Sequence, residues 1–248
     1  MTKDLKISGS GTIFAGEYDT IGISGGASID GDITFDTLKV SGGCHTNAPC
    51  ILKGTALRIS GSLKASGELQ VEDCHISGSC KLTDCEVHGN TLHVSGSLTT
   101  NRNIKVKELK SSGSIKSNNA KIYADSILIS GSFVNDDEIN ADDIELYGSS
   151  TLNDVFGEHV RIGIVPKNCH VLSFRLFSSE KRPVHHVKNI ECTQLEAASL
   201  HCESISAETI ELSKYSVVDH IQCDGSLVYD STCKIGTVEG TCTQSVKE

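Results

Sequence analysis

Apolar residues recur along this chain in pairs separated by one position, and the pairs recur with a period of about 17 residues. In residues 57–73 the pairs are Leu57/Ile59, Leu63/Ala65 and Leu69/Val71, and the next period repeats them as Cys74/Ile76, Cys80/Leu82 and Cys85/Val87. Apolar side chains at i and i+2 share one face of a strand, whereas a helix would place them at i, i+3, i+4 and i+7. Each period therefore predicts three short strands with two inward side chains apiece.

Each period also contains the pattern apolar-x-apolar-Ser-Gly or a close variant of it. The nine copies start at Leu5, Ile21, Leu38, Leu57, Cys74, Leu92, Leu109, Ile127 and Ile144, at spacings of 16 to 19 residues. All nine keep the glycine, from Gly9 to Gly148. Because the glycine follows a strand pair, we expect it to form the turn to the next side with a positive φ.

Stacking such periods predicts an all-β fold, a right-handed parallel β-helix that forms a three-sided solenoid with about 17 residues per coil. The hand follows the general preference for right-handed crossovers between parallel strands. A narrow interior also accounts for an aromatic content of only five Tyr, six Phe and no Trp. We predict a buried set consisting of Ile59, Leu63, Val71, Ile76, Leu82, Val94, Leu98 and Ile129. We predict a solvent-facing set consisting of Arg58, Lys64, His75 and Lys81.

The pattern divides the chain into three parts. Residues 5–163 form the main β-helix of nine coils, and residues 189–240, where apolar residues recur every five positions, form a second and shorter block. Between them, residues 164–188 lose the register and carry two of the three prolines and a basic cluster. We interpret this segment as an irregular bridge between two stacks, or else as a docking loop. The candidate docking residues are Phe174, Arg175, Phe177, Lys181 and Arg182.

Composition narrows the functional classes. The chain has 22 Lys and Arg against 32 Asp and Glu, a formal net charge of −10, which argues against nucleic acid as the partner. No apolar run approaches the roughly 18 residues of a membrane-spanning helix, and the first residues resemble no secretion signal. The eleven cysteines are interpreted as reduced thiols. We expect a cytoplasmic protein, either free or at the inner face of the cell membrane.

Candidate chemistry is sparse. Cys74, Cys80 and Cys85 fall on inward positions of three different sides, so we interpret them as core residues rather than zinc ligands. The acidic segment 136–143 lacks a calcium-binding pattern, and we interpret it as a solvated turn. His185 and His186, beside the basic cluster, are expected to be solvated. No nucleophile, phosphate-loop or metalloprotease motif occurs, so we predict no catalytic residue, no metal, no cofactor and no enzyme activity.

The nine motif copies, especially LRISGSL, LHVSGSL and ILISGSF, resemble the bactofilins, which are bacterial polymer-forming cytoskeletal proteins. The resemblance covers residues 5–160 closely and 190–240 loosely, although typical members have a shorter core between disordered tails. It implies a right-handed β-helix that assembles without nucleotide into non-polar filaments and serves as a scaffold in cell shape, motility or protein localisation. The implied partner is the protein itself, or a paralogous bactofilin. Some members reach membranes through an N-terminal segment, which Met1–Asp4 does not match.

The ends of the predicted rod are the candidate polymerisation interface, because a solenoid exposes unpaired strand edges and core at each end unless a cap covers them. The candidate residues are Leu5, Ile7, Ile13, Phe14, Ile235 and Val238. Two alternatives remain open, a left-handed β-helix enzyme of the acyltransferase type and a monomeric β-helical binding rod. The paired inward residues and the drifting spacing disfavour the enzyme, whose hexapeptide coils have single inward residues.

Overall fold

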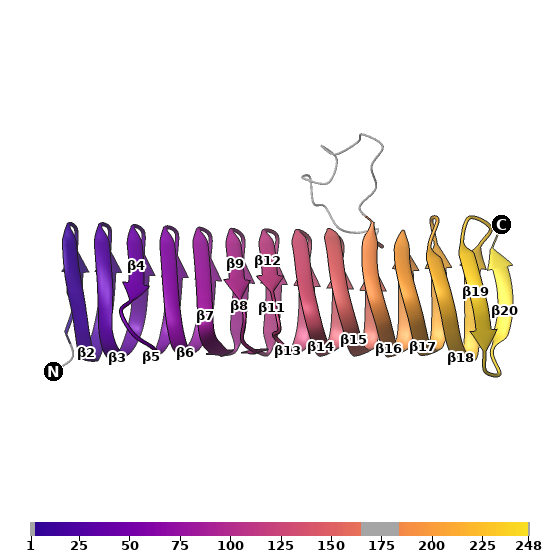
Figure 1. The fold of residues 1–248 in the computed structure, drawn as a ribbon, viewed down its shortest axis with the longest axis horizontal. Helices are drawn as coiled ribbons and strands as arrows, with labels where there is room; N and C mark the ends of the chain where they lie inside the picture. The colour runs from indigo at the N-terminus through magenta and orange to yellow at the C-terminus, as the bar shows by residue number, and fades with distance from the viewer. Residues whose placement is uncertain (1–2, 165–183, 248) are drawn as a thin grey trace, which may run out of the picture.

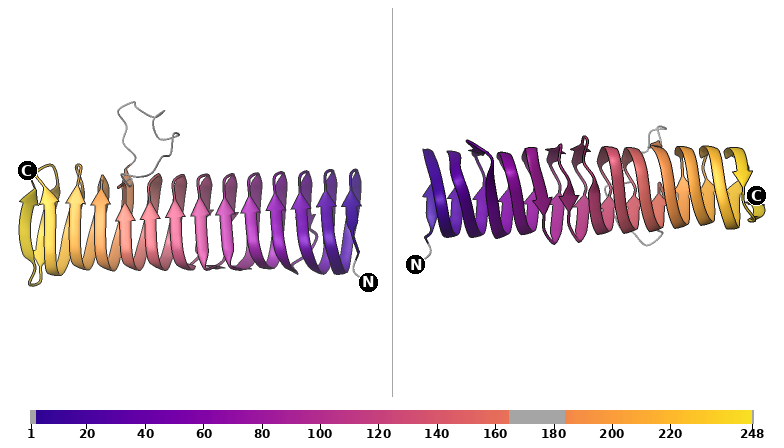
Figure 2. Two further views of the ribbon diagram at one scale, coloured as in Figure 1. Left: turned by 180° about the vertical axis from the view of Figure 1, so that it is seen from behind. Right: turned by 60° about the horizontal axis from the view of Figure 1, so that its bottom comes forward.

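The computed structural model describes residues 3–164 and 184–247, which form one straight rod with the two termini at opposite ends (Figure 1). Strands make up 79% of the structure, and every pairing between them is parallel. They stack as a β-solenoid of about 13 turns with a repeat of roughly 17 residues. The views in Figure 2 show the same stack from two further directions. The prediction of an all-β parallel β-helix is confirmed.

The twenty strands follow one another along the rod. They are β1 Leu5–Ile7, β2 Ser10–Ile23, β3 Gly26–Val40, β4 Gly43–Thr46, β5 Cys50–Ile59, β6 Ser62–Ile76, β7 Ser79–His88, β8 Thr91–Val94, β9 Ser97–Thr100, β10 Ile104–Lys105, β11 Glu108–Ser111, β12 Ser114–Ser117, β13 Ile122–Ile129, β14 Ser132–Leu146, β15 Ser149–Ile162, β16 His185–Ala198, β17 Leu200–Ser213, β18 Val217–Asp230, β19 Lys234–Glu239 and β20 Thr243–Lys247.

One coil shows how the sequence makes three sides. In β3 the buried residues come in three pairs, Ala27/Ile29, Ile33/Phe35 and Leu38/Val40. The chain bends between the first two pairs at Gly31, whose φ of 102° favours glycine. It bends again between the second and third pairs, and a third time at the Ser-Gly turn that follows β3. Three corners separate three sides, and each side turns two side chains inward.

Residues at the same position in successive coils form columns along the rod. For example, Leu38 pairs with Leu57, and Leu57 pairs with Cys74. The eight residues predicted to be buried are all at most 3% exposed. Burial of such aliphatic side chains contributes about 1.5–3 kcal/mol each before conformational entropy is subtracted. The core is therefore a continuous set of apolar columns, as the period of two predicts.

The side chains predicted to face solvent divide into two groups. Lys64 and Lys81 are exposed, whereas Arg58 and His75 are half-buried. The Arg58 Nη1 atom donates to the Asp73 carbonyl oxygen at 3.3 Å, so this side chain lies along the surface rather than extending away from it.

The expectation that the motif glycine needs a positive φ is wrong. Positive φ values occur at glycines of other turns, such as Gly16, Gly31 and Gly67. The motif glycines are needed because the stacked turns approach each other closely. A Cβ atom on Gly61 would lie 2.0 Å from the carbonyl oxygen of Gly42, and all eight copies from Gly25 to Gly148 would meet a carbonyl oxygen at 1.8–2.0 Å.

The two predicted blocks form one continuous stack. β15 pairs with β16 from Ser150↔His185 to Ile162↔Ala197, so the columns cross the interruption in register (Figure 1). Residues 185–188, assigned above to the bridge, are instead the first residues of β16. The stack also extends beyond residue 240, because β20 continues it to Lys247. The candidate docking residues Phe174, Arg175, Phe177, Lys181 and Arg182 lie outside the described residues.

His185 is buried, contrary to the expectation that it is solvated. It occupies an inward column between Ser150 and Leu200, and its Nδ1 atom lies 2.8 Å from the Ser150 hydroxyl oxygen. Burial, with a smaller effect of the neighbouring His186, lowers the pKa of His185 to about 4. His186 is exposed, as expected, and its ring contacts that of His201. The expectation failed for His185 because the register of β16 is hidden by the interruption before it.

Cys74, Cys80 and Cys85 are buried, which confirms their interpretation as core residues. Burial raises the pKa values of the Cys74 and Cys85 thiols to about 12, so both remain protonated at neutral pH. The ten cysteines in the described part of the chain are all free thiols.

Candidate functional site

The described residues offer no centre for catalysis by a metal. Across 3–164 and 184–247, no group of three or more His, Cys, Asp or Glu side chains is arranged to hold an ion. The same residues contain no helix that could cross a membrane. The candidate functional surfaces are therefore the two ends of the rod and its long sides.

The N-terminal end of the rod is an open strand edge. β1 and the first part of β2 pair with the following coil on one side only. Their other edge presents backbone N–H and C=O groups that have no strand partner within the described residues. Such groups carry a free-energy cost when they lie beside an apolar surface without a hydrogen-bond partner. This edge can therefore accept another strand.

The structure separates the candidate residues of the first coil by accessibility. Leu5 is partly exposed and packs against the core, and Phe14 is 63% exposed. Ile7 is only 9% exposed, and Ile13 is fully buried. Ile13 therefore supports the first coil from inside and offers no side-chain surface to a partner.

Tyr18 belongs to this end, although the sequence analysis did not single it out. Its hydroxyl donates to the Phe14 carbonyl oxygen at 2.9 Å, and its partly buried ring packs against the core. Tyr18 pairs with Phe35, which pairs with Gly54, and the Phe35 ring occupies the space beside Gly54. The signal that could have identified Tyr18 is an aromatic residue in the last inward position of the first period.

The motif glycine of the first coil differs from the other eight. A Cβ atom added to Gly9 would meet nothing within 4 Å, because no described coil lies before it. Each of the other motif glycines is required by a carbonyl oxygen of the preceding turn. Position 9 is therefore a glycine like the other eight motif positions, although no contact among the described residues requires a glycine there.

The C-terminal end is also an open edge, and its apolar side chains are more accessible. Among the described residues, β19 and β20 pair with β18 alone. Ile235 and Val238 in β19 are partly exposed and pack against the core, whereas Val246 in β20 is 56% exposed. Both candidate residues therefore lie in the last coil of the rod, where a further coil would cover them.

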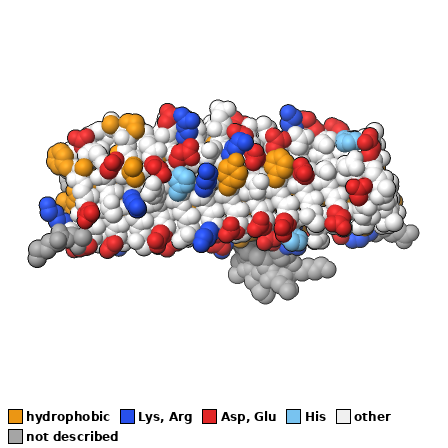
Figure 3. Space-filling view, turned by 90° about the horizontal axis from the view of Figure 1, so that it is seen from below, with side chains coloured by type: hydrophobic (Ala, Val, Ile, Leu, Met, Phe, Trp, Pro, Cys, Tyr) orange, Lys and Arg blue, Asp and Glu red, His pale blue; other side chains and the backbone are white. Residues whose placement is uncertain are grey.

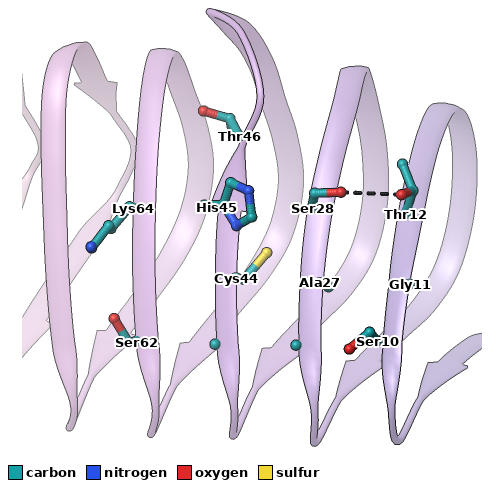
Figure 4. A pocket seen from close by; sticks show the side chains of 12 residues that line it. Ser10, Gly11, Thr12, Ala27, Ser28, Cys44, His45, Thr46, Ser62 and Lys64 are labelled. Atoms are coloured by element: carbon teal, nitrogen blue, oxygen red, sulfur yellow. Dashed lines mark hydrogen bonds between the residues drawn. The ribbon is translucent and has the colours of Figure 1, made fainter.

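A shallow hollow lies on one long side near the N-terminal end (Figure 4). It exists because the outward side chains of the first two coils, Thr12 and Ser28, are small there, and they hydrogen-bond to each other at 3.1 Å. His45 and Lys64 line the hollow toward the middle of the rod. No Asp or Glu lines the hollow, and it is open to solvent.

Comparison with known proteins found no match, so a functional conclusion must rest on the ends and long sides of the rod. No protein-family model, no curated protein and no solved structure matches this chain.

Proposed function

We propose that this chain is a structural protein that assembles end to end into nucleotide-independent filaments, as a cytoplasmic bacterial scaffold of the bactofilin kind. In that role it would support cell shape, motility or the localisation of other proteins. The observation that carries the proposal is the pair of open strand edges at opposite ends of one straight rod (Figure 1).

Addition of a second rod satisfies both the backbone and the core at a junction. Unpaired N–H and C=O groups gain hydrogen bonds, and partly exposed side chains such as Leu5, Ile235 and Val238 lose contact with water. If unlike ends meet, the parallel sheets continue from rod to rod. If like ends meet, the filament has no polarity, as the resemblance to bactofilins implies.

Gly9 supports a junction in which another coil lies directly against the first one. Its hydrogen atoms face open space at the N-terminal edge, where a carbonyl oxygen of an added coil can approach as closely as Gly42 approaches Gly61. An alanine at this position would hinder that approach without disturbing the coils of its own rod.

The test uses exposed apolar residues at the two ends. We expect Phe14→Arg or Val246→Arg to weaken assembly, because each places a charge beside the junction at a position that is already solvent-exposed. Ile51→Arg is the matched control, since Ile51 is an exposed apolar residue along the rod in β5. Sedimentation and negative-stain electron microscopy measure the polymer, and circular dichroism confirms that each variant remains folded.

Wild-type protein and Ile51→Arg should form filaments, whereas at least one of the end variants should not. A wild-type protein that stays monomeric at high concentration contradicts the proposal and favours the binding rod. A discrete trimer instead favours the acyltransferase-type enzyme. Filaments that survive both end substitutions place the junction elsewhere and refute the assignment of the ends.

A further inference from the structure

Two cysteine side chains meet at the C-terminal end of the rod. Cys223 lies in β18 and is buried, whereas Cys242 lies in the last coil, between β19 and β20, where it is partly exposed and packs against the core. The Cys223 thiol can donate a hydrogen bond either to the Glu208 carbonyl oxygen, 3.4 Å away, or to the Cys242 sulfur. The two sulfur atoms are therefore neighbours across the last junction between coils.

The turn that carries Cys242 is held against the coil of Cys223. A Cβ atom on Gly240, whose φ is 103°, would lie 2.2 Å from the Cys223 carbonyl oxygen. Thr241 N–H donates to Asp224 Oδ1 at 3.3 Å, and the Thr241 hydroxyl donates to the Asp224 carbonyl oxygen at 3.3 Å. The backbone contacts on the N-terminal side of Cys242 therefore bring the two thiols together.

Other cysteines have different surroundings. Cys74 is buried in a column between Leu57 and Leu92, so its neighbours in the adjacent coils are aliphatic side chains. Cys233, the other cysteine of the last coil, is also partly exposed, but its thiol donates to Asp230 Oδ1 at 3.4 Å. Burial and this carboxylate raise the pKa of Cys233, which keeps its thiol protonated and weakly nucleophilic. Cys233 is therefore a natural comparison for Cys242.

We propose that Cys223 and Cys242 form a reversible disulfide that fastens the last coil of the rod to the coil before it. A disulfide joins residues whose Cα atoms are about 4.4–6.8 Å apart. Stacked strands lie about 4.8 Å apart, so a bond between neighbouring coils falls within this range. A partly exposed disulfide is of the labile kind that thiol reductants reopen, which suits a bond that forms only under oxidising conditions.

The two thiols have different parts in the reaction. Cys242 reacts first with a peroxide, because it is the accessible member of the pair. Burial, followed by the hydrogen bond with Cys242, raises the pKa of Cys223 to about 11, so Cys223 remains a protonated thiol until its partner has been oxidised.

The reaction uses one hydrogen peroxide for each disulfide. The Cys242 thiolate attacks one peroxide oxygen and the O–O bond breaks, which leaves a sulfenic acid and a hydroxide that takes up the proton released by the thiol. The Cys223 sulfur then attacks the Cys242 sulfur, and the S–O bond breaks as the S–S bond forms. The departing hydroxide takes the Cys223 proton. Two thiols lose two electrons and two protons, and the peroxide is reduced to two waters.

A small uncharged peroxide fits this site better than a bulky anionic oxidant such as glutathione disulfide. Cys242 is only partly exposed, and the Asp224 carboxylate lies beside its turn. The chain has a net charge of −10, and Figure 3 shows Asp and Glu side chains spread along the face of the rod seen from below. This charge repels anions and leaves a neutral oxidant unaffected.

The disulfide would stabilise the part of the rod that forms its C-terminal edge. The loop closed between the two cysteines contains β19, in which Ile235 and Val238 are only partly buried (Figure 1). A bond across a loop of this length lowers the population of locally opened states about 100-fold. The site does not depend on assembly, although in a filament it would hold this edge in the position that a further rod requires.

The test is oxidation by hydrogen peroxide followed by peptide mapping. The protein is oxidised, alkylated under denaturing conditions and digested without reductant, so that a pair of linked peptides identifies the bond. Three proteins are compared: the parent, Cys242→Ser, and the matched control Cys233→Ser, which replaces the other partly exposed cysteine of the last coil. All three carry Cys169→Ser, which removes the one cysteine outside the described residues. Hydrogen exchange of the β19 amides is measured before and after oxidation.

We expect the parent and Cys233→Ser to yield one linked peptide pair, which contains Cys223 and Cys242 and is separated by dithiothreitol. Cys242→Ser should yield none. Exchange in β19 should be about 100-fold slower in the oxidised parent than in the reduced parent, and peroxide should leave it unchanged in Cys242→Ser. The proposal is overturned if Cys242 gains oxygen without forming the bond, or if it links to another cysteine or a second chain. It is also overturned if the bond forms and exchange in β19 does not change.

Discussion

The close stacking of the Ser-Gly turns predicts that adding a single Cβ atom to a motif glycine destabilises the rod. In Gly78→Ala, the new Cβ atom would lie 2.0 Å from the Gly61 carbonyl oxygen and 2.5 Å from that of Ser60. Ordinary contacts of this kind are not shorter than 3.0 Å, so the two turns must separate by about 1 Å. The turns cannot separate freely, because Gly78 N–H donates to Ile59 at 2.9 Å and Ser79 N–H donates to Gly61 at 2.9 Å.

The cost follows from these contacts. Weakening two backbone hydrogen bonds costs about 1 kcal/mol each, and the overpacking adds about 1–3 kcal/mol. Reduced freedom of the unfolded chain returns about 0.4–1 kcal/mol. The net loss is about 2–4 kcal/mol, which for a chain of this size corresponds to a melting temperature lower by roughly 4–16 °C.

Gly9→Ala is the matched control, because the same substitution in the same motif meets nothing within 4 Å. Thermal unfolding, followed by circular dichroism in the Phe14→Arg background to suppress assembly, measures both variants. We expect Gly9→Ala to melt within about 2 °C of its parent. Equal melting temperatures for Gly78→Ala and its parent, or an equal loss for both variants, would refute close approach as the reason for the motif glycine.

Three further predictions concern the interior. His185 has a pKa of about 4 in the folded state against 6.5 when unperturbed. The unfolded chain therefore binds a proton more readily than the folded one below pH 6.5, and the free energy of unfolding falls as the pH drops from 6.5 toward 4. Urea unfolding should show a loss of about 2 kcal/mol between pH 7 and pH 5 that His185→Leu reduces; an unchanged loss would contradict the assignment. Asn135→Leu should destabilise the rod by about 2–3 kcal/mol in the same assay, because it removes hydrogen bonds from Asn135 Nδ2 to Ser117 Oγ at 2.7 Å and to the Ala120 carbonyl oxygen at 2.8 Å. Native alkylation followed by peptide mass spectrometry should leave Cys74 unmodified until denaturant is added; rapid modification would show that it is not buried.

The period of two predicted the core, because burial in a thin solenoid is decided within each strand. Ile59 and Leu63 are buried and Lys64 is exposed simply through alternation. Alternation within a strand does not predict the contacts between coils. The role of the motif glycine depends on the distance between stacked turns, which no single period contains. The repeat therefore identified the glycine as necessary, but the expected positive φ was not the reason for it.

The candidate site was less predictable than the fold. Phe14 and Ile13 are neighbours in an apolar stretch, yet only Phe14 is accessible, because the pleat turns Ile13 inward. His185 lies just after an interruption, so its inward position follows only from its pairing with Ser150.

The division of the middle coils into short strands has a mechanical consequence. Backbone hydrogen bonds between coils run along the rod, so tension on a filament would load all the bonds of one junction at once. The coil made of β10, β11 and β12 shares ten paired positions with the coil that follows it, against eleven between β14 and β15. Division into short strands therefore costs few bonds, and under stretching force we expect these junctions between coils to resist almost equally.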